Sequence, residues 1–456
     1  MSFNNLPAAI QSVIQAGYLE HQFGLPLKAK LGFRAVADRE PFLANVGETI
    51  IKTRTGLLPT VTVPMAPAGN SDFTSGLTPQ QYGVEQYVLA IAQYAGAMQL
   101  NVATSRVALG DLYLRNSYTL GEQAARSVDT LAQQALFNAY MGGNTRVRTT
   151  LGSAGATVAV DDIRGFLSTL NGNGQVVPVS SGNPLSVIVG AGVYACTGWS
   201  ADGANVSTAP GGISGTLSFS SNVTVSDGTA ANSVVSAVAP YVVRPSTVSG
   251  NVMASNTAQI SAASNVNGGK LTMQMILNAK ATMSANGVPV VEETGMYHLY
   301  LDPLQATGLY SDPAFQQFFR GQVTSKEYRE GVIAEMLGVR LQETNLNPVQ
   351  TLAGVGTVRR GILAGQGALV EGVFTSEGYA DNLEGAGGAD DEAMILVIDD
   401  IAHVTREPLD ALKQVVTQSW SYMGGFVVPT DTTTNPNTIP TASNAAYKRG
   451  ILLESL

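Results

Sequence analysis

The chain has 456 residues, of which 45% are hydrophobic and only 13% are charged, and its net charge is −9. This length favours one large domain with an insertion, or two to three domains, over one simple core. The negative charge argues against a main surface that grips nucleic acid, because phosphate binding needs clustered lysine and arginine.

Cysteine usage and hydropathy exclude further classes of protein. A single cysteine, Cys196, leaves no intrachain disulfide. No run of about 18 apolar residues predicts a membrane span, so we expect no membrane partner. Residues 1–11 lack the basic and apolar regions of a signal peptide. We therefore expect a chain that is made and folded in a cytoplasm.

The N-terminal part of the chain reads as two arms. Residues 1–45 predict an extended arm with a short helix. Residues 46–103 predict a two-stranded arm, with strand-like runs at 48–54 and 86–94 on either side of a tip rich in Pro and Gly. A lone hairpin has little core of its own. We expect it to lie on a neighbouring subunit.

Residues 119–141 show the clearest helical pattern. Thr119 and Glu122 have the spacing of a capping box, which would start the helix. Apolar residues then recur at spacings of three and four from Leu120 onward, which predicts one buried stripe. Gly142 and Gly143 predict the end of the helix.

Residues 144–268 differ from the rest, because lysine is absent and Gly, Ser, Thr, Val and Ala dominate. Short apolar runs alternate with turn residues, which predicts a mostly β insertion such as a small sandwich. One short helix is expected at 161–170.

Helices and strands are mixed after residue 268, so the fold class predicted for the whole chain is α+β. Helices are expected at 272–286, from Ser311-Asp-Pro313 onward, and from Pro408 through Met423. The expected strands are 297–301, 358–363, 368–374, 394–398 and 426–428.

No constellation of residues predicts catalysis or a cofactor. The three histidines are His21, His298 and His403, and none has a paired metal-ligand spacing. His298 alternates within an apolar strand, so we interpret it as a hydrogen-bonded structural histidine. Val189–Ala195 matches a G-x-G-x-x-A pattern, but a turn-like segment follows it where a nucleotide site needs a helix.

An acidic stretch is the one candidate for a metal ion. No Lys or Arg occurs between Arg360 and Arg406, while Asp390, Asp391 and Glu392 stand together in a glycine-rich segment. Clustered carboxylates suit a divalent cation. A solvated acidic loop is the commoner reading of such a cluster.

The order of the predicted elements resembles the major capsid proteins of tailed bacteriophages, with the Hong-Kong-97-type fold. The local sequence resembles the branch of the coliphage N-four coat protein at Gln22–Gly24, Leu77–Pro79, Leu120–Leu131 and Leu301–Pro303. The resemblance covers about 20–143 and 268–430. It does not cover 144–268, so it assigns the insertion no role.

The resemblance implies a domain plan and no catalytic residues. The plan comprises an N-terminal arm (1–45), an extended loop (46–103), a peripheral domain with the spine helix (104–143, with 269–289 and 406–456), the insertion (144–268) and an axial domain (290–405).

The resemblance also implies hexamers and pentamers of this chain that form an icosahedral head around double-stranded DNA. Portal, scaffold and decoration proteins are the other expected partners, with the shell assembled in the host bacterial cytoplasm. Gly47 and Gly96 are hinge candidates between arm and body. The expected interface residues are Glu48, Lys52, Arg54, Tyr87, Tyr94, Arg106, Arg126 and Asp399.

Two other protein classes fit parts of the pattern. An encapsulin-like cage would share the fold and package enzymes, and neighbouring genes would separate it from a phage capsid. A surface-layer or adhesin-type β protein would account for the Thr-, Ser- and Gly-rich middle, but the absence of a signal peptide counts against it.

Overall fold

The computed structural model forms two compact units. Unit 1 comprises residues 1–50, 88–135 and 369–427, and unit 2 comprises 51–87, 136–368 and 428–456. The residues that the structure describes are 22–24, 32–42, 49–55, 84–101, 109–170, 176–203, 213–230, 232–236, 242–245, 268–285, 287–320, 335–352, 356–374, 393–406, 414–429 and 449–456.

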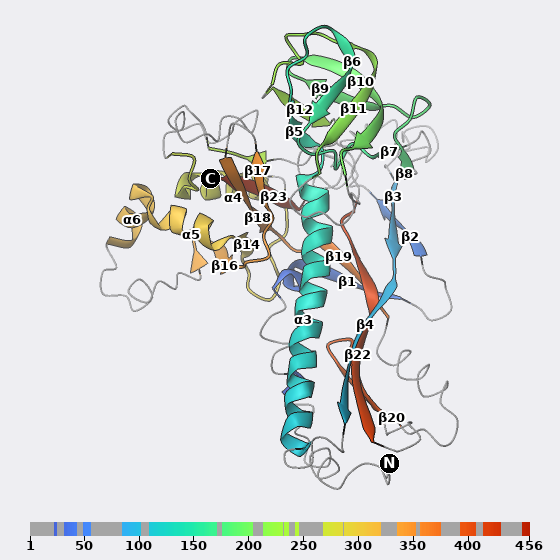
Figure 1. Cartoon of the computed structure of the whole chain (residues 1–456). Coiled ribbons are helices and arrows are strands. Elements are labelled where there is room, and N and C mark those ends of the chain that lie inside the picture. Colours follow the sequence, from blue (N-terminus) through green and yellow to red (C-terminus); the bar gives the residue numbers. More distant parts are fainter. Residues whose placement is uncertain are drawn as a thin grey trace, which may run out of the picture. The chain divides into compact units, whose positions relative to one another are not determined.

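Unit 1 is a sheet covered by one long helix, α3 (Leu109–Met141) (Figure 1). Its strands run in the order β1-β19-β22-β21-β20, and β4 pairs with β22 as an additional strand. Strand β1 lies parallel to β19, while the pairs that β22 makes are antiparallel. The strands are β1 (Ala37–Phe42), β4 (Ala92–Asn101), β19 (Leu369–Phe374), β20 (Ala393–Ile398), β21 (Ile401–Arg406) and β22 (Val415–Val427).

The core of unit 1 lies between α3 and this sheet. Leu120, Ala124 and Val128 of the predicted apolar stripe are fully buried, together with Trp420 and Tyr422 of β22. Helix α3 has 33 residues, a length of about 50 Å. It continues through Ala135, the last residue assigned to unit 1, to its end in unit 2.

The predicted start of this helix is wrong. The helix begins ten residues earlier, at Leu109, and the Thr119 hydroxyl donates to the carbonyl of Arg115 within the helix, at 2.9 Å. The buried stripe continues backward through Ser117 and Tyr113, at the same spacings. A buried serine interrupted the apolar pattern, so the sequence alone did not reveal the first three turns. The predicted end, at Gly142, is confirmed.

The predicted C-terminal helix is also wrong over its described part. Residues Val415–Val427 form strand β22, and the start at Pro408 lies outside the described residues. Along β22, Val416, Gln418, Trp420 and Tyr422 are buried, which is a period of two. Val416 and Trp420 are four residues apart, a spacing that satisfies a helix and a strand equally.

The predicted arm hairpin is confirmed for the pair β2 and β3, but the return strand predicted at 86–94 is interrupted at Ile91, and its second part belongs to another sheet. Strand β2 (Thr49–Thr55) pairs with β3 (Val84–Ala90) as a separate two-stranded sheet. The chain then continues into β4, which pairs with β22 over ten residues. Gly96 lies inside this ladder against the Trp420 ring, so its prediction as a hinge is wrong, and Gly47 lies outside the described residues.

Unit 2 contains a second sheet, in the order β13-β23-β18-β14-β16-β15, with β17 paired to β18. Helices α4 (Met273–Ala285), α5 (Pro303–Tyr310) and α6 (Pro313–Arg320) contribute buried side chains to its core. The strands are β13 (Val242–Val243), β14 (Tyr297–Leu301), β15 (Glu335–Met336), β16 (Val339–Glu343), β17 (Val349–Leu352), β18 (Gly356–Ala364) and β23 (Gly450–Ser455).

The helices at 272–286 and after Pro313 are confirmed, as is the strand at 297–301, but α5 was not predicted. Its cap is readable in the sequence. The Asp302 carboxylate accepts from the Leu304 amide, Gln305 completes the capping box, and Pro303 occupies the first turn.

The insertion folds as a closed β barrel and not as a sandwich. Its strands are antiparallel neighbours in the order β5-β12-β9-β10-β11-β6. A bridge between Val147 and Val160 joins the two ends of this order, so the barrel closes (Figure 1, green). Closure removes the exposed edges that a short sandwich would leave. The strands are β5 (Asn144–Arg146), β6 (Gly155–Val160), β9 (Leu185–Val189), β10 (Gly192–Ala201), β11 (Gly215–Val223) and β12 (Ser233–Ser236).

The short helix expected at 161–170 is absent from these residues. The segment makes turns and then β7 (Ser168–Leu170), which pairs with β8 (Val176–Pro178). The β character of the insertion is confirmed throughout its described residues, and so is the α+β class of the whole chain.

Replacing Gly165 by alanine is expected to destabilise the subunit by more than about 2 kcal/mol. Gly165 has a φ of +82°, and a Cβ there would overlap the backbone of Gly142 and Gly143. Urea unfolding of the unassembled subunit would measure the loss. Gly152 is the matched control, because a Cβ there meets nothing within 4 Å. Equal stability of the two variants would contradict the steric argument.

Candidate functional site

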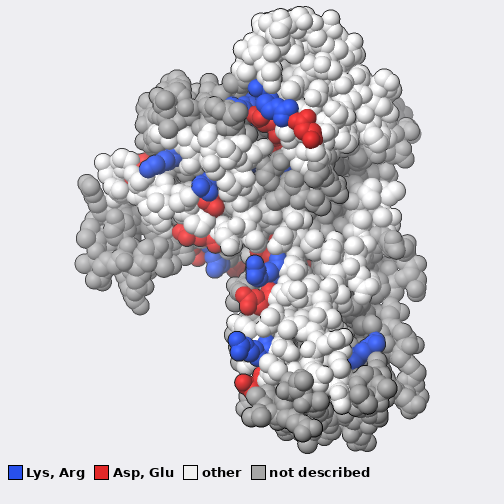
Figure 2. Space-filling model, viewed as in Figure 1, with Lys and Arg blue, Asp and Glu red and all other residues white. Residues whose placement is uncertain are grey.

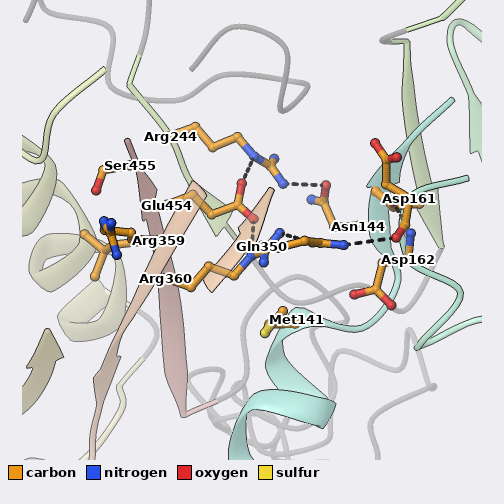
Figure 3. A network of polar contacts seen from close by, with 12 residues as sticks. Met141, Asn144, Asp161, Asp162, Arg244, Gln350, Arg359, Arg360, Glu454 and Ser455 are labelled. Carbon is orange, nitrogen blue, oxygen red and sulfur yellow. Dashed lines mark hydrogen bonds and ion pairs between the residues drawn. The ribbon is translucent and has the colours of Figure 1, made fainter. Parts of the chain in front are cut away.

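A network of buried charges joins the barrel to the second sheet of unit 2 (Figure 3). Glu454 on β23 is 3% exposed and accepts from two arginines, Arg244 at 2.6 Å and Arg360 at 3.0 Å. Burial alone raises the pKa of Glu454, but the two guanidinium charges and their hydrogen bonds outweigh it, so the pKa lies below its usual value. Glu454 is therefore held as a carboxylate.

The same arginines extend the network to the barrel. Arg244 donates to the Asn144 side chain on β5 at 2.9 Å, and Arg360 donates to the Gln350 side chain at 2.8 Å. Gln350 in turn donates to the carbonyl of Asp161, at 3.2 Å, just after β6. The insertion is thus tied to the body by polar contacts at both ends of its strand order.

A second buried network lies in unit 1 around Glu371, which is fully buried on β19. Arg34 donates to both of its carboxylate oxygens at 2.8 Å, and Tyr422 donates to one of them at 2.7 Å. Burial alone would lower the pKa of Arg34. The negative charges of Glu371 and Asp400 outweigh this effect, so the pKa of Arg34 lies above its usual value. Burial and the Glu371 charge likewise raise the pKa of Tyr422.

Arg34 also holds the turn between β20 and β21. Asp399 and Asp400 have φ values of 49° and 65°, a conformation that costs non-glycine residues energy. Arg34 donates to the Asp399 carbonyl at 2.8 Å and to the Asp400 carboxylate at 3.1 Å. One arginine from the N-terminal segment therefore neutralises a buried carboxylate and stabilises a strained turn.

Two histidines, His298 and His403, are buried, and neither forms an ion pair with another described residue. His298 makes one hydrogen bond, with the Thr294 hydroxyl at 2.9 Å, which agrees with the structural role expected of it. Both ring nitrogens of His403 lack a hydrogen-bond partner among the described residues, and its ring packs against Phe23 with centroids 4.7 Å apart. Burial lowers the pKa of each histidine to about 4, and for His298 the Arg340 charge adds to this effect.

Acidification is expected to destabilise the subunit through these histidines. Because the folded pKa of each lies near 4, below the unfolded value of 6.5, the unfolded chain binds more protons between these pH values. The contribution of the neutral histidines to the free energy of unfolding is therefore complete above pH 6.5. It is lost as the pH falls toward 4, by about 3 kcal/mol for each histidine.

The variant His403→Leu tests this expectation. Urea unfolding at pH 7 and pH 4 should show a loss about 3 kcal/mol smaller in the variant than in the unchanged chain. Burial raises the pKa of Asp129 to about 6, so protonation of Asp129 stabilises the fold as the pH falls. Both chains contain Asp129, so its effect cancels in the difference between their losses. The same acid-induced loss in both chains would contradict the account.

The predicted interface residues lie in different surroundings. Glu48 and Arg106 lie outside the described residues, as does the side chain of Arg54. Tyr87 is buried within the chain, and Tyr94 stacks on Tyr422 with centroids 6.5 Å apart. Lys52 is half-buried on β2, whereas Arg126 on α3 and Asp399 are exposed.

The metal candidates Asp390, Asp391 and Glu392 lie outside the described residues, so the structure does not place them. Within the described part, no three His, Cys, Asp or Glu side chains form a group that could hold a metal ion. No described helix is long and apolar enough to cross a membrane. The G-x-G-x-x-A segment forms the β9–β10 hairpin, with no helix after the glycines.

The structure resembles solved chains of phage capsids across nearly its whole length. The capsid of Ralstonia phage GP4 has 13% identity and a TM-score of 0.49, over 94% of this chain and 90% of that one. The capsid of cyanophage Pam1 has 11% identity and a TM-score of 0.46, over 92% and 88%. The capsid of cyanophage P-SCSP1u has 13% identity and a TM-score of 0.43, over 93% and 87%. No family model and no curated protein matches the sequence.

Proposed function

We propose that this chain is the major capsid protein of a tailed bacteriophage. It self-assembles through hexamers and pentamers into the icosahedral head that encloses double-stranded DNA. The role is structural, with no catalytic residue and no cofactor. The observation that carries the proposal is the combination of exposed apolar side chains on the hairpin and a long strand, β4, that has no charged residue.

The hairpin strands present apolar side chains to solvent. Ile51 on β2 is 62% exposed and Val88 on β3 is 49% exposed. A two-stranded sheet is marginally stable at best when it stands alone. Apolar side chains on such a sheet favour its burial against another subunit. An extended capsid loop would be buried in this way.

Strand β4 is the second feature that favours assembly. It is a ten-residue edge strand without a charged residue, and in the described part of the chain it pairs only with β22. Monomeric proteins usually shorten, charge or cover such an edge, because it is a template for pairing with another chain. An edge of this length fits a protein whose function is assembly.

Within this proposal the domain plan follows the two units. Helix α3 and its sheet act as the peripheral domain. The predicted axial segment 290–405 divides, since its strands up to Ala364 lie in unit 2 while β19, β20 and β21 lie in unit 1. We assign the axial role to the unit 2 sheet. The predicted extended loop (46–103) also divides, because β4 belongs to the unit 1 sheet, so we assign the extended-loop role to the β2–β3 hairpin.

Replacing Ile51 by lysine is expected to abolish shell assembly while the subunit stays folded. A charge at this exposed position would oppose burial against a neighbour but would not disturb the core. Sedimentation velocity would measure the assembled fraction, and circular dichroism the fold. Val290→Lys is the matched control, because Val290 is 39% exposed and lies outside the hairpin. Shells of I51K in normal yield would contradict the role of the hairpin.

An encapsulin-like cage remains the second candidate, since it would have the same fold and the same sedimentation. Heads that contain double-stranded DNA after expression in an infected host would favour the capsid. Cages that contain a protein cargo and no DNA would favour the alternative.

A further inference from the structure

The outer wall of the barrel carries one row of apolar side chains across three neighbouring strands. Val235 on β12 pairs with Ile188 on β9, and Ile188 pairs with Val193 on β10. Ile188 is 41% exposed and Val193 is 68% exposed, and Val235 is half-buried. Directly opposed side chains lie about 5 Å apart, so the three form one continuous patch.

This barrel wall is also almost free of charge. Residues 144–236 contain three arginines and four aspartates. Each of these side chains has a partner within the insertion, in the pairs Arg146–Asp161, Arg164–Asp162 and Arg148–Asp202 and in the hydrogen bond of Tyr194 to Asp227. On the face of the barrel that Figure 2 shows, the surface is white apart from charges at its base.

The near absence of charge on the barrel wall limits the kinds of molecule that could bind there. Nucleic acid would need lysine and arginine on the wall, and lysine is absent from residues 144–268. A strongly charged protein partner would need unpaired charges of the opposite sign. In a two-fold contact a patch meets the same patch of the second copy, and residues at the axis meet their own copies. Like charges would repel there, so an uncharged apolar row suits such a contact.

We infer that the row formed by Ile188, Val193 and Val235 docks on the same row of a second copy of this chain. The contact is isologous, so the barrels clamp subunits together in pairs. The inference rests on the proposed function, because it assigns the insertion a place in the shell lattice.

A cysteine placed in the row tests this directly. The only native cysteine, Cys196, is fully buried, and burial raises the pKa of its thiol, so it reacts slowly with maleimides. Val193→Cys would react with a short bismaleimide that links two copies. Thr157→Cys is the matched control, because Thr157 is exposed on β6, three strands away around the barrel from β9.

The full-length variants would be crosslinked at assembly concentration, run on a denaturing gel, and analysed in parallel by sedimentation velocity. We expect more than half of V193C to become covalent dimer in assembled particles, and T157C to remain monomeric. Shells that form without a V193C crosslink would overturn the clamp and leave the capsid function standing. Equal crosslinking of T157C would also overturn it.

The remaining outcomes separate the clamp from the proposed function. Crosslinked V193C dimers without shells would support the barrel contact and contradict the capsid role. A chain that stays monomeric and does not crosslink would overturn both. Val193→Lys adds a second readout, since two lysines brought together at the contact should reduce the fraction of assembled subunits at least tenfold relative to Thr157→Lys.

Discussion

Replacing Glu454 by alanine is expected to lower the free energy of unfolding by about 3–5 kcal/mol, because it leaves two arginines buried without their counter-charge. Arg244 and Arg360 both donate to this carboxylate, and neither is more than 5% exposed. Urea unfolding of the unassembled subunit would measure the change.

Two further variants isolate the cause of this loss. Glu343 is exposed at the end of β16, so Glu343→Ala should change stability by less than about 0.5 kcal/mol. Replacing the three network residues together, by R244M, R360M and E454L, should recover most of the loss, because a buried ionic group contributes little net stability over apolar packing. A triple variant as unstable as E454A would contradict this.

Replacing Arg34 by methionine is expected to cost a similar amount, about 3–5 kcal/mol. The variant leaves Glu371 fully buried and negative, and it removes the donors that hold Asp399 and Asp400 in their strained turn. Two independent penalties thus follow from one substitution.

Arg39→Met is the matched control for this second prediction. Arg39 approaches the same two carboxylates, Glu371 at 3.7 Å and Asp400 at 3.6 Å, but its side chain is 51% exposed. An exposed ion pair contributes at most about 1 kcal/mol. The difference between the two variants in thermal or urea unfolding measures what burial adds. A loss of equal size in both would contradict the account.

The local elements were predictable where one periodicity dominates. Helix α4 and strand β14 follow their patterns, and the glycines after Met141 end helix α3 as expected. The sequence was ambiguous where two periodicities coincide, as at Val416 and Trp420, and where a polar residue is buried in an apolar stripe, as at Ser117. Tertiary packing decided both cases.

The charged networks could not be predicted, because their members lie far apart in the chain. Arg34 and Glu371 are separated by 337 residues, and Arg244 and Glu454 by 210. The closure of the barrel was hidden for the same reason, since it depends on one bridge between Val147 and Val160 and not on any local pattern. The low share of charged residues in the sequence did predict surfaces with little charge, such as the barrel wall.

Electron cryomicroscopy of the purified, unmodified chain tests whether it builds a capsid shell. We expect closed shells or capsomer sheets tens of nanometres across, with the β2–β3 hairpin of each subunit against a neighbour. A monodisperse monomer or dimer at every concentration, also after addition of candidate scaffold proteins, would contradict the claim that this chain builds a capsid.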